Sequence, residues 1–396
     1  MMKQPPLKIG LFGLGVVGQG LLDVLHKSSF QGAEVTKVCV KTPGKPRSVV
    51  PEKLTFEAAD ILDDPDIDVV VETIPGSEEA FQIVSKAMTR GKNVITANKK
   101  MLANHLQQLL ELQETTGASL LYESAACGGI PIVRTIEEHF GSEPMERVSG
   151  IFNGTSNYIL SKMFRENLDF DLALKQAQNL GFAEIDASSD IDGLDAKYKL
   201  ILLTAHSHGL IIRPEEVLNL GIRHLRNVDI DFARKQGLKI KLLPVCKRSG
   251  INRLAMYVIP GLVGEKDELY HVEDEFNGVQ LHTAYSGHQF FRGRGAGGFP
   301  TGSALLSDLA ALQQGYKYPY RKHRLNGSTR LDEDVNLSLY MRLPEQLSPE
   351  NVPFTKIYTT ERLPGCQLVT GEMTLQALRS CSLQLQHQGV FVMRTQ

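Results

Sequence analysis

Apolar positions in the first third of the chain alternate between short continuous runs and segments with helical spacing. Uninterrupted apolar runs are typical of strands that a parallel sheet buries on both faces. These runs lie at 7–13, 34–40, 68–74, 93–98 and 119–125. Helical spacing, with an apolar residue every three or four positions, occurs at 16–27, 77–90 and 100–116. Because strands and helices alternate, we predict a doubly wound α/β domain over residues 1–130.

After "GGIP" at 128–131 the pattern changes, and helices separate from strands. Helical patterns occur at 131–140, at 155–181 as two helices, and at 192–208. Strand patterns occur at 147–153, 238–247, 253–260 and 278–291, and the last three suggest antiparallel pairing. We therefore predict a second domain of the α+β class over 131–300.

The last hundred residues contain three different patterns. Leu305, Leu309 and Leu312 lie on one face of a predicted helix over 301–316, which we expect to return and complete the first domain. Residues 317–335 are polar and predict a linker. Residues 336–396 predict a small α+β C-terminal module.

Composition narrows the function classes. The chain has 396 residues and a net charge of −2, so no basic excess favours nucleic acid or an anionic membrane surface as a partner. We find no apolar run of about 18 residues that could span a bilayer. The five cysteines are scattered without a C-x-x-C pair, so we expect neither a thiolate metal site nor a redox dithiol. Together these features predict a cytoplasmic protein.

A glycine motif suggests a nucleotide site. Gly13, Gly15 and Gly18 form G-x-G-x-x-G between the first predicted strand and the first helix. In this position the glycines permit a tight turn, and the helix N-terminus can bind a pyrophosphate, as in Rossmann domains. The alternative is a purely structural glycine turn.

The end of the second predicted strand bears on the choice of cofactor. An NAD site usually places an acid there, whereas this chain has Lys41, Lys45 and Arg47 and no acid. These cations favour the 2′-phosphate of NADP; the alternative is that they are ordinary loop residues.

Two lysines follow the strand at 93–98. Lys99 and Lys100 come at its carboxyl end, where open α/β sheets bind their ligands. Lys99 is the better candidate for a site residue, although both lysines could equally be solvated residues that open a helix.

The segment "GFAEIDASSDIDGLDAKYK" (181–199) gathers acids and a lysine. We predict a helix that begins near Asp192, on which Asp195 and Lys199 are four residues apart and share a face. The simpler interpretation is an acid-rich helix start with a surface ion pair. In the functional interpretation Glu184 and Asp190 bind a substrate ammonium, and Lys199 gives a proton to a developing alkoxide.

Motifs in a fixed order make the chain resemble the homoserine dehydrogenase family from about Lys8 to Lys317. They are "GLGVVGQG", "NVITANKK", "YESAACGGIPIV", "GIFNGTSNYIL", "GFAEIDASSDIDGLDAKYKL", "LGIRHL" with "GLKIKLLPV", and "GRGAGGFPTGSALLSDL". The resemblance implies NAD(P)-dependent interconversion of L-homoserine and L-aspartate 4-semialdehyde, in the biosynthesis of threonine, methionine and isoleucine.

The resemblance also implies residue roles. Lys199 would exchange the proton of the substrate oxygen, and Lys99 would be the second catalytic lysine. The implied substrate contacts are Glu184, Asp190, Asp195 and Thr155. The implied cofactor contacts are Gly13, Leu14, Gly15, Val16, Val17, Gly18, Lys41, Thr73, Ala97, Lys99, Gly295 and Gly297. A monovalent cation, usually sodium in the family, would be bound by Glu123 and the carbonyls of Ala126, Gly128 and Ile130.

The family resemblance implies a homodimer or homotetramer, with the second domain also serving in dimerisation. The C-terminal module begins like the first strand of a regulatory ACT domain but lacks the glycine-bearing effector loop, so it is either a degenerate ACT-like module or an unrelated cap. Three rival interpretations stay open: an NAD-preferring enzyme, a related amino-acid dehydrogenase, and a non-catalytic NADP-binding sensor.

Overall fold

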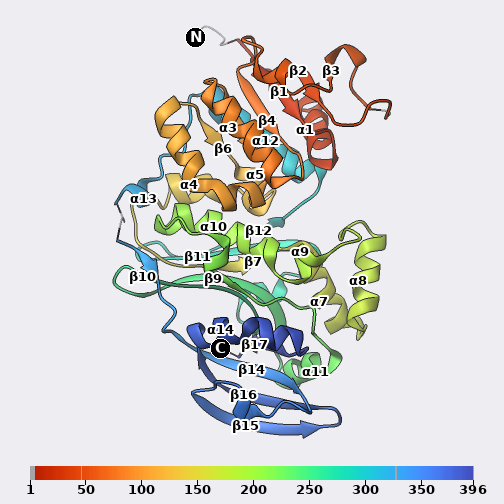
Figure 1. Cartoon of the computed structure of the whole chain (residues 1–396), viewed down its shortest axis with the longest axis vertical. Coiled ribbons are helices and arrows are strands. Elements are labelled where there is room, and N and C mark those ends of the chain that lie inside the picture. Colours follow the sequence, from red (N-terminus) through yellow and green to blue (C-terminus); the bar gives the residue numbers. More distant parts are fainter. Residues whose placement is uncertain (1–4, 46, 326–327, 396) are drawn as a thin grey trace. The chain divides into compact units, whose positions relative to one another are not determined.

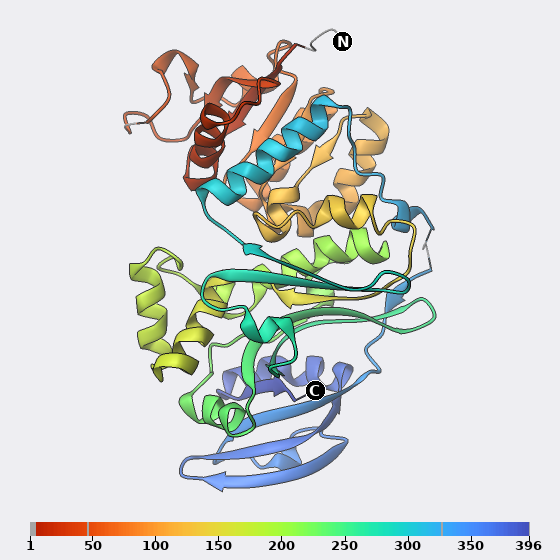
Figure 2. The same ribbon diagram turned by 180° about the vertical axis from the view of Figure 1, so that it is seen from behind.

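The computed structural model describes residues 5–45, 47–325 and 328–395. The chain folds as two compact units, each assembled from separated stretches of sequence (Figures 1 and 2). The first unit contains residues 1–142, 201–213 and 294–324. The second unit contains residues 143–200, 214–293 and 325–396.

The core of the first unit is a parallel sheet with the strand order β3-β2-β1-β4-β5-β6. Its strands are β1 (Leu7–Phe12), β2 (Ala33–Cys39), β3 (Leu54–Thr55), β4 (Val69–Glu72), β5 (Asn93–Thr96) and β6 (Leu120–Leu121). The central strands β1 and β4 are buried on both faces, which explains their continuous apolar sequence. The strand order reverses beside β1, and ligands of such sheets bind beyond the carboxyl ends of the strands at that point.

Helices cover this sheet. They are α1 (Val16–Lys27), α2 (Ala59–Leu62), α3 (Ser77–Thr89), α4 (Lys99–Thr116), α5 (Glu123–Cys127), α6 (Val133–Glu138), α12 (Gly298–Gln313) and α13 (Arg321–Leu325), with a 3₁₀ turn, η1, at Pro51–Lys53.

Helix α12, drawn in cyan, lies against α1 although some 270 residues separate them (Figure 2). Their close approach depends on glycine. A Cβ atom on Gly20 would lie 2.1 Å from the carbonyl oxygen of Gly298, and one on Gly302 would lie 2.4 Å from that of Gly20. The two backbones therefore touch without intervening side chains, and this contact joins the late segment to the first sheet.

The second unit is built on a mixed sheet with the order β12-β11-β7-β9-β10-β17-β14-β16-β15, to which β8 and β13 add beside β10. The strands are β7 (Met145–Ile151), β8 (Leu218–Asn219), β9 (Lys239–Gly250), β10 (Arg253–Val263), β11 (Phe276–Thr283), β12 (Gly287–Arg294), β13 (Arg330–Leu331), β14 (Asn336–Pro344), β15 (Lys356–Leu363), β16 (Cys366–Thr374) and β17 (Phe391–Arg394). The last strands of the chain continue the sheet because β17 lies between β10 and β14.

The helices of the second unit pack on this sheet. They are α7 (Gly154–Glu166), α8 (Phe170–Asn179), α9 (Ser188–Ile191), α10 (Leu194–His208, which continues into the first unit from Ile201), α11 (Asn227–Lys235) and α14 (Leu375–His387), with 3₁₀ turns η2 (Pro214–Glu216), η3 (Glu268–His271) and η4 (Pro349–Asn351).

A buried polar cluster joins β14 to the start of α11. The Arg342 guanidinium lies 3.1 Å from the Asp229 carboxylate, which also accepts a hydrogen bond from the Tyr340 hydroxyl at 2.7 Å. All three side chains are essentially inaccessible to solvent. Burial raises the pKa of Asp229, and Arg342 opposes that rise. The C-terminal strands are thus tied to the unit by a charge pair as well as by apolar packing.

Four sequence-based element predictions need correction. The apolar stretch 119–125 is strand only at Leu120–Leu121 and then turns into α5. The helix predicted from Asp192 is interrupted, because Gly193 has φ of +79° and separates α9 from α10. The stretch 278–291 is a hairpin of β11 and β12 rather than one strand.

The predicted linker at 317–335 is also structured in part. It contains α13 and β13, and β13 pairs with β10. Residues 326 and 327 of this stretch lie outside the described residues. The predicted domain boundaries, including the separate module at 336–396, stay predictions.

Replacing Gly20 by Ala tests the α1–α12 contact. The new methyl group would overlap the backbone of Gly298, so we expect the free energy of unfolding to fall by about 1–3 kcal/mol or more. Urea unfolding followed by circular dichroism measures this change. Gly250→Ala is the matched control, because its methyl group would meet nothing closer than 3.7 Å. Equal stability of the two variants would contradict the proposed contact.

Candidate active site

A buried ion pair on α10 is the centre of the candidate site in the second unit. The Lys199 Nζ lies 2.9 Å from Oδ2 of Asp195 and donates a hydrogen bond to the carbonyl oxygen of Phe152 at 2.6 Å. Lys199 is 6% exposed and Asp195 4%, so this is not the surface pair of the simpler interpretation. The spacing of four residues placed both on one helical face, as predicted.

Asn153 links this pair to the next acid. Its Nδ2 donates to Oδ1 of Asp190 at 2.7 Å and to Oδ2 of Asp195 at 3.0 Å. Its Oδ1 caps α7 by accepting from the backbone N–H of Ser156 at 2.7 Å. The helix cap therefore fixes the amide that holds the two carboxylates together. Asn153 was not predicted from the sequence, where the only local signal is an asparagine directly before a helix start.

Asp190 is held near a second negative charge. Burial, and then repulsion from Asp195, raises its pKa, while the hydrogen bond from Asn153 and the neighbouring Thr155 hydroxyl oppose the rise. Two neighbouring carboxylates with one lysine leave the cluster able to accept another cation. A substrate ammonium has the charge and the donors to fill that place.

Thr155 connects the beginning of α7 to the segment that follows α8 by a hydrogen bond. Its hydroxyl donates to the carbonyl oxygen of Phe182 at 2.6 Å. The predicted partner Glu184 is on the same segment, but its side chain is exposed and is not brought into the Asp190–Asp195 cluster. Of the predicted substrate contacts, the structure thus brings together Asp190, Asp195 and Thr155.

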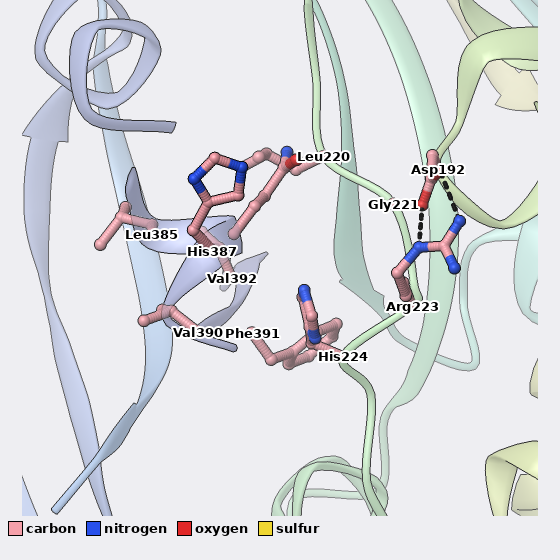
Figure 3. A pocket seen from close by; sticks show the side chains of 11 residues that line it. Asp192, Leu220, Gly221, Arg223, His224, Leu385, His387, Val390, Phe391 and Val392 are labelled. Atoms are coloured by element: carbon pink, nitrogen blue, oxygen red, sulfur yellow. Dashed lines mark hydrogen bonds and ion pairs between the residues drawn. The ribbon is translucent and has the colours of Figure 1, made fainter. Parts of the chain in front are cut away.

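Two further acids of the segment have local structural roles. Asp186 accepts the backbone N–H of Ser188 at the start of α9, and Asp192 forms a paired contact with Arg223 at 2.7 Å. This ion pair lies at the edge of a cavity of about 290 Å³. Figure 3 shows it opposite Leu385, at the end of α14, and Val390, which follows that helix. Arg223 also donates to the Ser188 hydroxyl, so it fixes both ends of α9.

The first unit contains a larger cavity beside the glycine motif. Its volume is about 840 Å³. Its lining includes the predicted cofactor contacts Gly13, Leu14, Gly15, Lys41 and Thr73, together with Lys45 and Arg47. The hydroxyl of Thr73 donates to the carbonyl oxygens of Phe12 and Gly13 at 2.9 and 3.0 Å, which fixes the turn.

The glycines fit a bound dinucleotide. Gly13 has φ of +89°, and a Cβ on Gly18 would lie 2.3 Å from the carbonyl oxygen of Gly13, so both are required by the turn. A Cβ on Gly15 would meet nothing within 4 Å, which leaves open space over the first turn of α1. This is the cradle that a pyrophosphate occupies in dinucleotide-binding domains.

Two of the three cations on the wall of this cavity, Lys41 and Arg47, have protein partners. Lys41 Nζ lies 2.5 Å from the carboxylate of Glu79, and Arg47 donates to the carbonyl oxygens of Thr42 and Lys45. Glu79 comes from α3 and is therefore an acid that the sequence of the β2 loop did not reveal. A 2′-phosphate would have to share Lys41 with it.

The remaining predicted cofactor residues lie around the carboxyl ends of the strands. Ala97 and the partly exposed Lys99 follow β5, and Asn98 between them caps α4 and bonds the carbonyl oxygens of Ile74 and Gly76. Val16, Val17 and Gly18 form the first turn of α1, and Gly295 and Gly297 precede α12. Their contacts with a cofactor stay predictions.

The predicted cation site contains an unexpected contact. Both carboxylate oxygens of Glu123 accept backbone N–H groups at the start of α6, from Val133 at 2.7 Å and Arg134 at 3.0 Å. The Glu123 side chain therefore stabilises a helix terminus, and backbone carbonyls are the better donors for a monovalent cation. Among the described residues, no cluster of three or more His, Cys, Asp or Glu side chains has an arrangement that could hold a metal ion.

A cavity for a dinucleotide and a buried lysine–aspartate pair are the two components that a nicotinamide-dependent dehydrogenase requires. Comparison with known proteins specifies the class further. The family model "Homoserine dehydrogenase, NAD binding domain" matches residues 13–123, and the model "Homoserine dehydrogenase" matches residues 131–310. The chain belongs to the homoserine dehydrogenase family, whose members are NAD(P)-dependent oxidoreductases.

Individual relatives agree with this assignment. A homoserine dehydrogenase of Bacillus subtilis is 38% identical over 317 residues, which are 78% of this chain and 73% of the relative. One from Helicobacter pylori is 32% identical over 365 residues, covering 89% of this chain and 84% of the relative. The crystal structure of a homoserine dehydrogenase from Thiobacillus denitrificans matches 99% of this chain and 98% of its own, with a TM-score of 0.86 and 29% identity.

A further solved structure is a complex with a cofactor. It is a hyperthermophilic archaeal homoserine dehydrogenase in complex with NADPH, with a TM-score of 0.68, 26% identity, and coverage of 79% of this chain and 99% of that one. Among the described residues, we also find no helix with the length and apolar character needed to cross a membrane.

Glu72, at the end of β4, gives a prediction for stability against pH. Burial raises the pKa of its carboxyl from 4.5 to about 7. Between these values the folded protein holds a proton that the unfolded chain has released, so stability falls as pH rises through this window and is then constant. The loss amounts to roughly 3 kcal/mol. Urea unfolding of Glu72→Gln at pH 5 and pH 8 should show this part of the pH dependence removed.

Glu114→Gln, which changes an exposed carboxyl on α4, is the control and should keep the wild-type difference between the two pH values. The same pH dependence in Glu72→Gln and wild type would contradict the raised pKa.

Proposed function

We propose that the chain catalyses the NAD(P)-dependent interconversion of L-homoserine and L-aspartate 4-semialdehyde, a step in the biosynthesis of threonine, methionine and isoleucine. The observation that carries the proposal is the buried cluster of Lys199, Asp195, Asn153 and Asp190, in a chain that belongs to this enzyme family. The bound nicotinamide supplies the chemistry of hydride acceptance and donation.

Lys199 accepts and donates the proton of the substrate oxygen. In the oxidation direction its amine accepts the hydroxyl proton as the carbonyl forms, and in the reduction direction the ammonium returns it. The Phe152 carbonyl and the Asp195 carboxylate hold the Nζ in a fixed direction. A cationic donor at this place stabilises the negative charge that develops on oxygen.

Asp190 binds the substrate ammonium in this proposal. Its negative charge, reinforced by Asp195, attracts a cation, and Thr155 lies beside it. Glu184 would join only if substrate recruits its exposed side chain. Lys99, at the start of α4, is proposed as the second catalytic lysine, on the strength of the family motif.

We propose NADP as the preferred cofactor, with NAD also accepted. The support is the group Lys41, Lys45 and Arg47 on the wall of the cavity beside the glycine motif. A monovalent cation bound by Glu123 and the carbonyls of Ala126, Gly128 and Ile130, a homodimer or homotetramer, and a cytoplasmic location stay predictions.

Lys199→Ala tests the proton-transfer role. We expect kcat for homoserine oxidation to fall by about 10²–10⁴-fold, because the positioned proton acceptor is lost. The absorbance of the reduced nicotinamide, followed with L-homoserine and NADP or NAD, measures the rate and ranks the two cofactors.

Lys197→Met is the matched control. Lys197 is on the same helix and is also buried, but it lies outside the cluster, so the variant should keep kcat within about twofold. If Lys199→Ala retained wild-type activity while wild type turned over homoserine, the assigned role would be wrong. If the wild type shows no turnover in either direction, the proposed function itself is wrong.

Glu79→Gln tests the cofactor preference. Neutralising this carboxylate releases Lys41 for a 2′-phosphate, so kcat/KM for NADP relative to NAD should rise by about three- to tenfold. Lys41→Ala should lower the same ratio. The ratio of the two cofactor efficiencies, measured at saturating homoserine, reports both changes. If neither variant changes the ratio of kcat/KM for NADP to that for NAD, the Lys41 region does not select the cofactor.

A further inference from the structure

A row of basic side chains crosses one face of the sheet in the second unit. In the strand register, His282 of β11 is opposite Arg147 of β7, and Arg147 is opposite Lys247 of β9. Residues directly opposite each other in an antiparallel pair share a face, so the three side chains point to the same side. We call these three residues, together with Arg394, the basic row.

Arg394 of β17 completes the row from the other side. Its guanidinium carbon lies 5.3 Å from the centre of the Tyr257 ring. Tyr257 of β10 is opposite Val245, two residues before Lys247 on β9, so its ring is on the face of the row. Arg394 thus lies beside the Tyr257 ring, on the face of the sheet that also carries Arg147 and Lys247.

Such an arrangement is unfavourable without a counter-charge. Like charges directly opposite on neighbouring strands destabilise a sheet. In the described part of the chain, neither Arg147 nor Lys247 has a carboxylate within salt-bridge distance. By contrast Arg248, which follows Lys247 and points to the other face, lies 3.6 Å from the carboxylate of Glu146.

Within the residues that the structure describes, two buried polar atoms of the basic row and of Tyr257 also have no hydrogen-bond partner. The hydroxyl of Tyr257, a residue that is 0% exposed, has no hydrogen-bond partner among the described residues, and nor does Nε of Arg147. Buried groups of this kind are normally paired, so an unpaired hydroxyl beside cations suggests that a ligand supplies the acceptor.

The acids at the edge of the row have other partners. The Glu268 carboxylate lies 2.9 Å from Nε2 of His288, whose other nitrogen is 3.0 Å from His282. Oδ1 of Asp267 accepts from Gln280 at 2.7 Å and from the backbone N–H of Leu269 at 2.9 Å. Glu268 therefore compensates the histidine end of the row, whereas Asp267 is hydrogen-bonded elsewhere and acts on Arg147 only through its more distant charge.

The electrostatics agree with this geometry. Burial, and then the charges of Arg394 and Arg147, lowers the pKa of Lys247. Burial lowers the pKa of Arg147, and Arg394 adds to that effect. An anion bound on this face would offset the repulsion between Lys247, Arg147 and Arg394.

We propose that the basic row, with the Tyr257 hydroxyl, is a binding site for a phosphate-bearing small molecule. Phosphate oxygens accept several charge-assisted hydrogen bonds at once, and their tetrahedral arrangement can reach donors from neighbouring strands about 4.8 Å apart. A phosphate group also carries more than one negative charge, which suits three cations better than a single carboxylate does. This site is separate from the Lys199 cluster and does not depend on the proposed catalytic reaction.

Titration calorimetry of the full chain with inorganic pyrophosphate tests the site, with NADP present at saturation to fill the glycine loop. We expect one binding event in the wild type that Lys247→Met and Arg147→Met each weaken by at least about tenfold. Arg248→Met, which removes a cation from the other face of the same strand, is the control and should bind within about twofold of wild type.

A second measurement distinguishes a binding site from a structural cluster. Without pyrophosphate, Lys247→Met should melt about 1–3 °C above wild type because repulsion is relieved, and pyrophosphate should raise the melting temperature of wild type and Arg248→Met alone. No binding by wild type, or equal binding by Lys247→Met, would overturn the proposal. If pyrophosphate does not bind and Lys247→Met instead changes self-association in sedimentation, the face belongs to a second copy of the chain and the proposal is also wrong.

Discussion

The buried pair of Asp195 and Lys199 is the constraint on which the rest of the candidate site depends. A charge removed from water must be compensated, and losing one partner of a buried pair is far more costly than never having formed it. Here the compensation comes from the carbonyl of Phe152 and the amide of Asn153, both in the turn between β7 and α7. The turn and the helix therefore fix each other, and the lysine side chain has little freedom to rotate.

The need to compensate this pair also explains the break between α9 and α10 and the contacts that hold α9 in place. The break at Gly193 lets α9 end before α10 begins, so Asp190 and Asp195 can face the same amide of Asn153 although they are on different helices. A continuous helix would place residues 190 and 195 on different faces. Arg223 then secures α9 from outside through Asp192 and Ser188. One run of acids thus contributes both to the proposed substrate site and to the structure that supports it.

Features that depend on residues close together in the sequence could be predicted. Contacts between segments that are distant in the sequence could not. The parallel sheet, the glycine loop and the Asp195–Lys199 pair follow from local patterns and were predicted. The family resemblance was confirmed by the comparisons. Asn153 was missed, because nothing in its local sequence shows that its amide faces two acids from a later segment. Glu79 was missed for the same reason, since it reaches the Lys41 loop from α3. The break at Gly193 could have been suspected, but a positive φ is decided by packing as well as by residue type.

The glycine contact between α1 and α12 has a consequence for how the protein is made. The first unit takes its covering helices from both ends of a long stretch of chain, so the ribosome releases α1 well before α12 exists. At ordinary rates of synthesis the interval is roughly tens of seconds. During that time the glycine-lined side of α1 has no native partner, while the whole sequence of the second sheet up to β12 is being completed. The nucleotide-binding unit begins first and is finished only after most of the other unit has been synthesised.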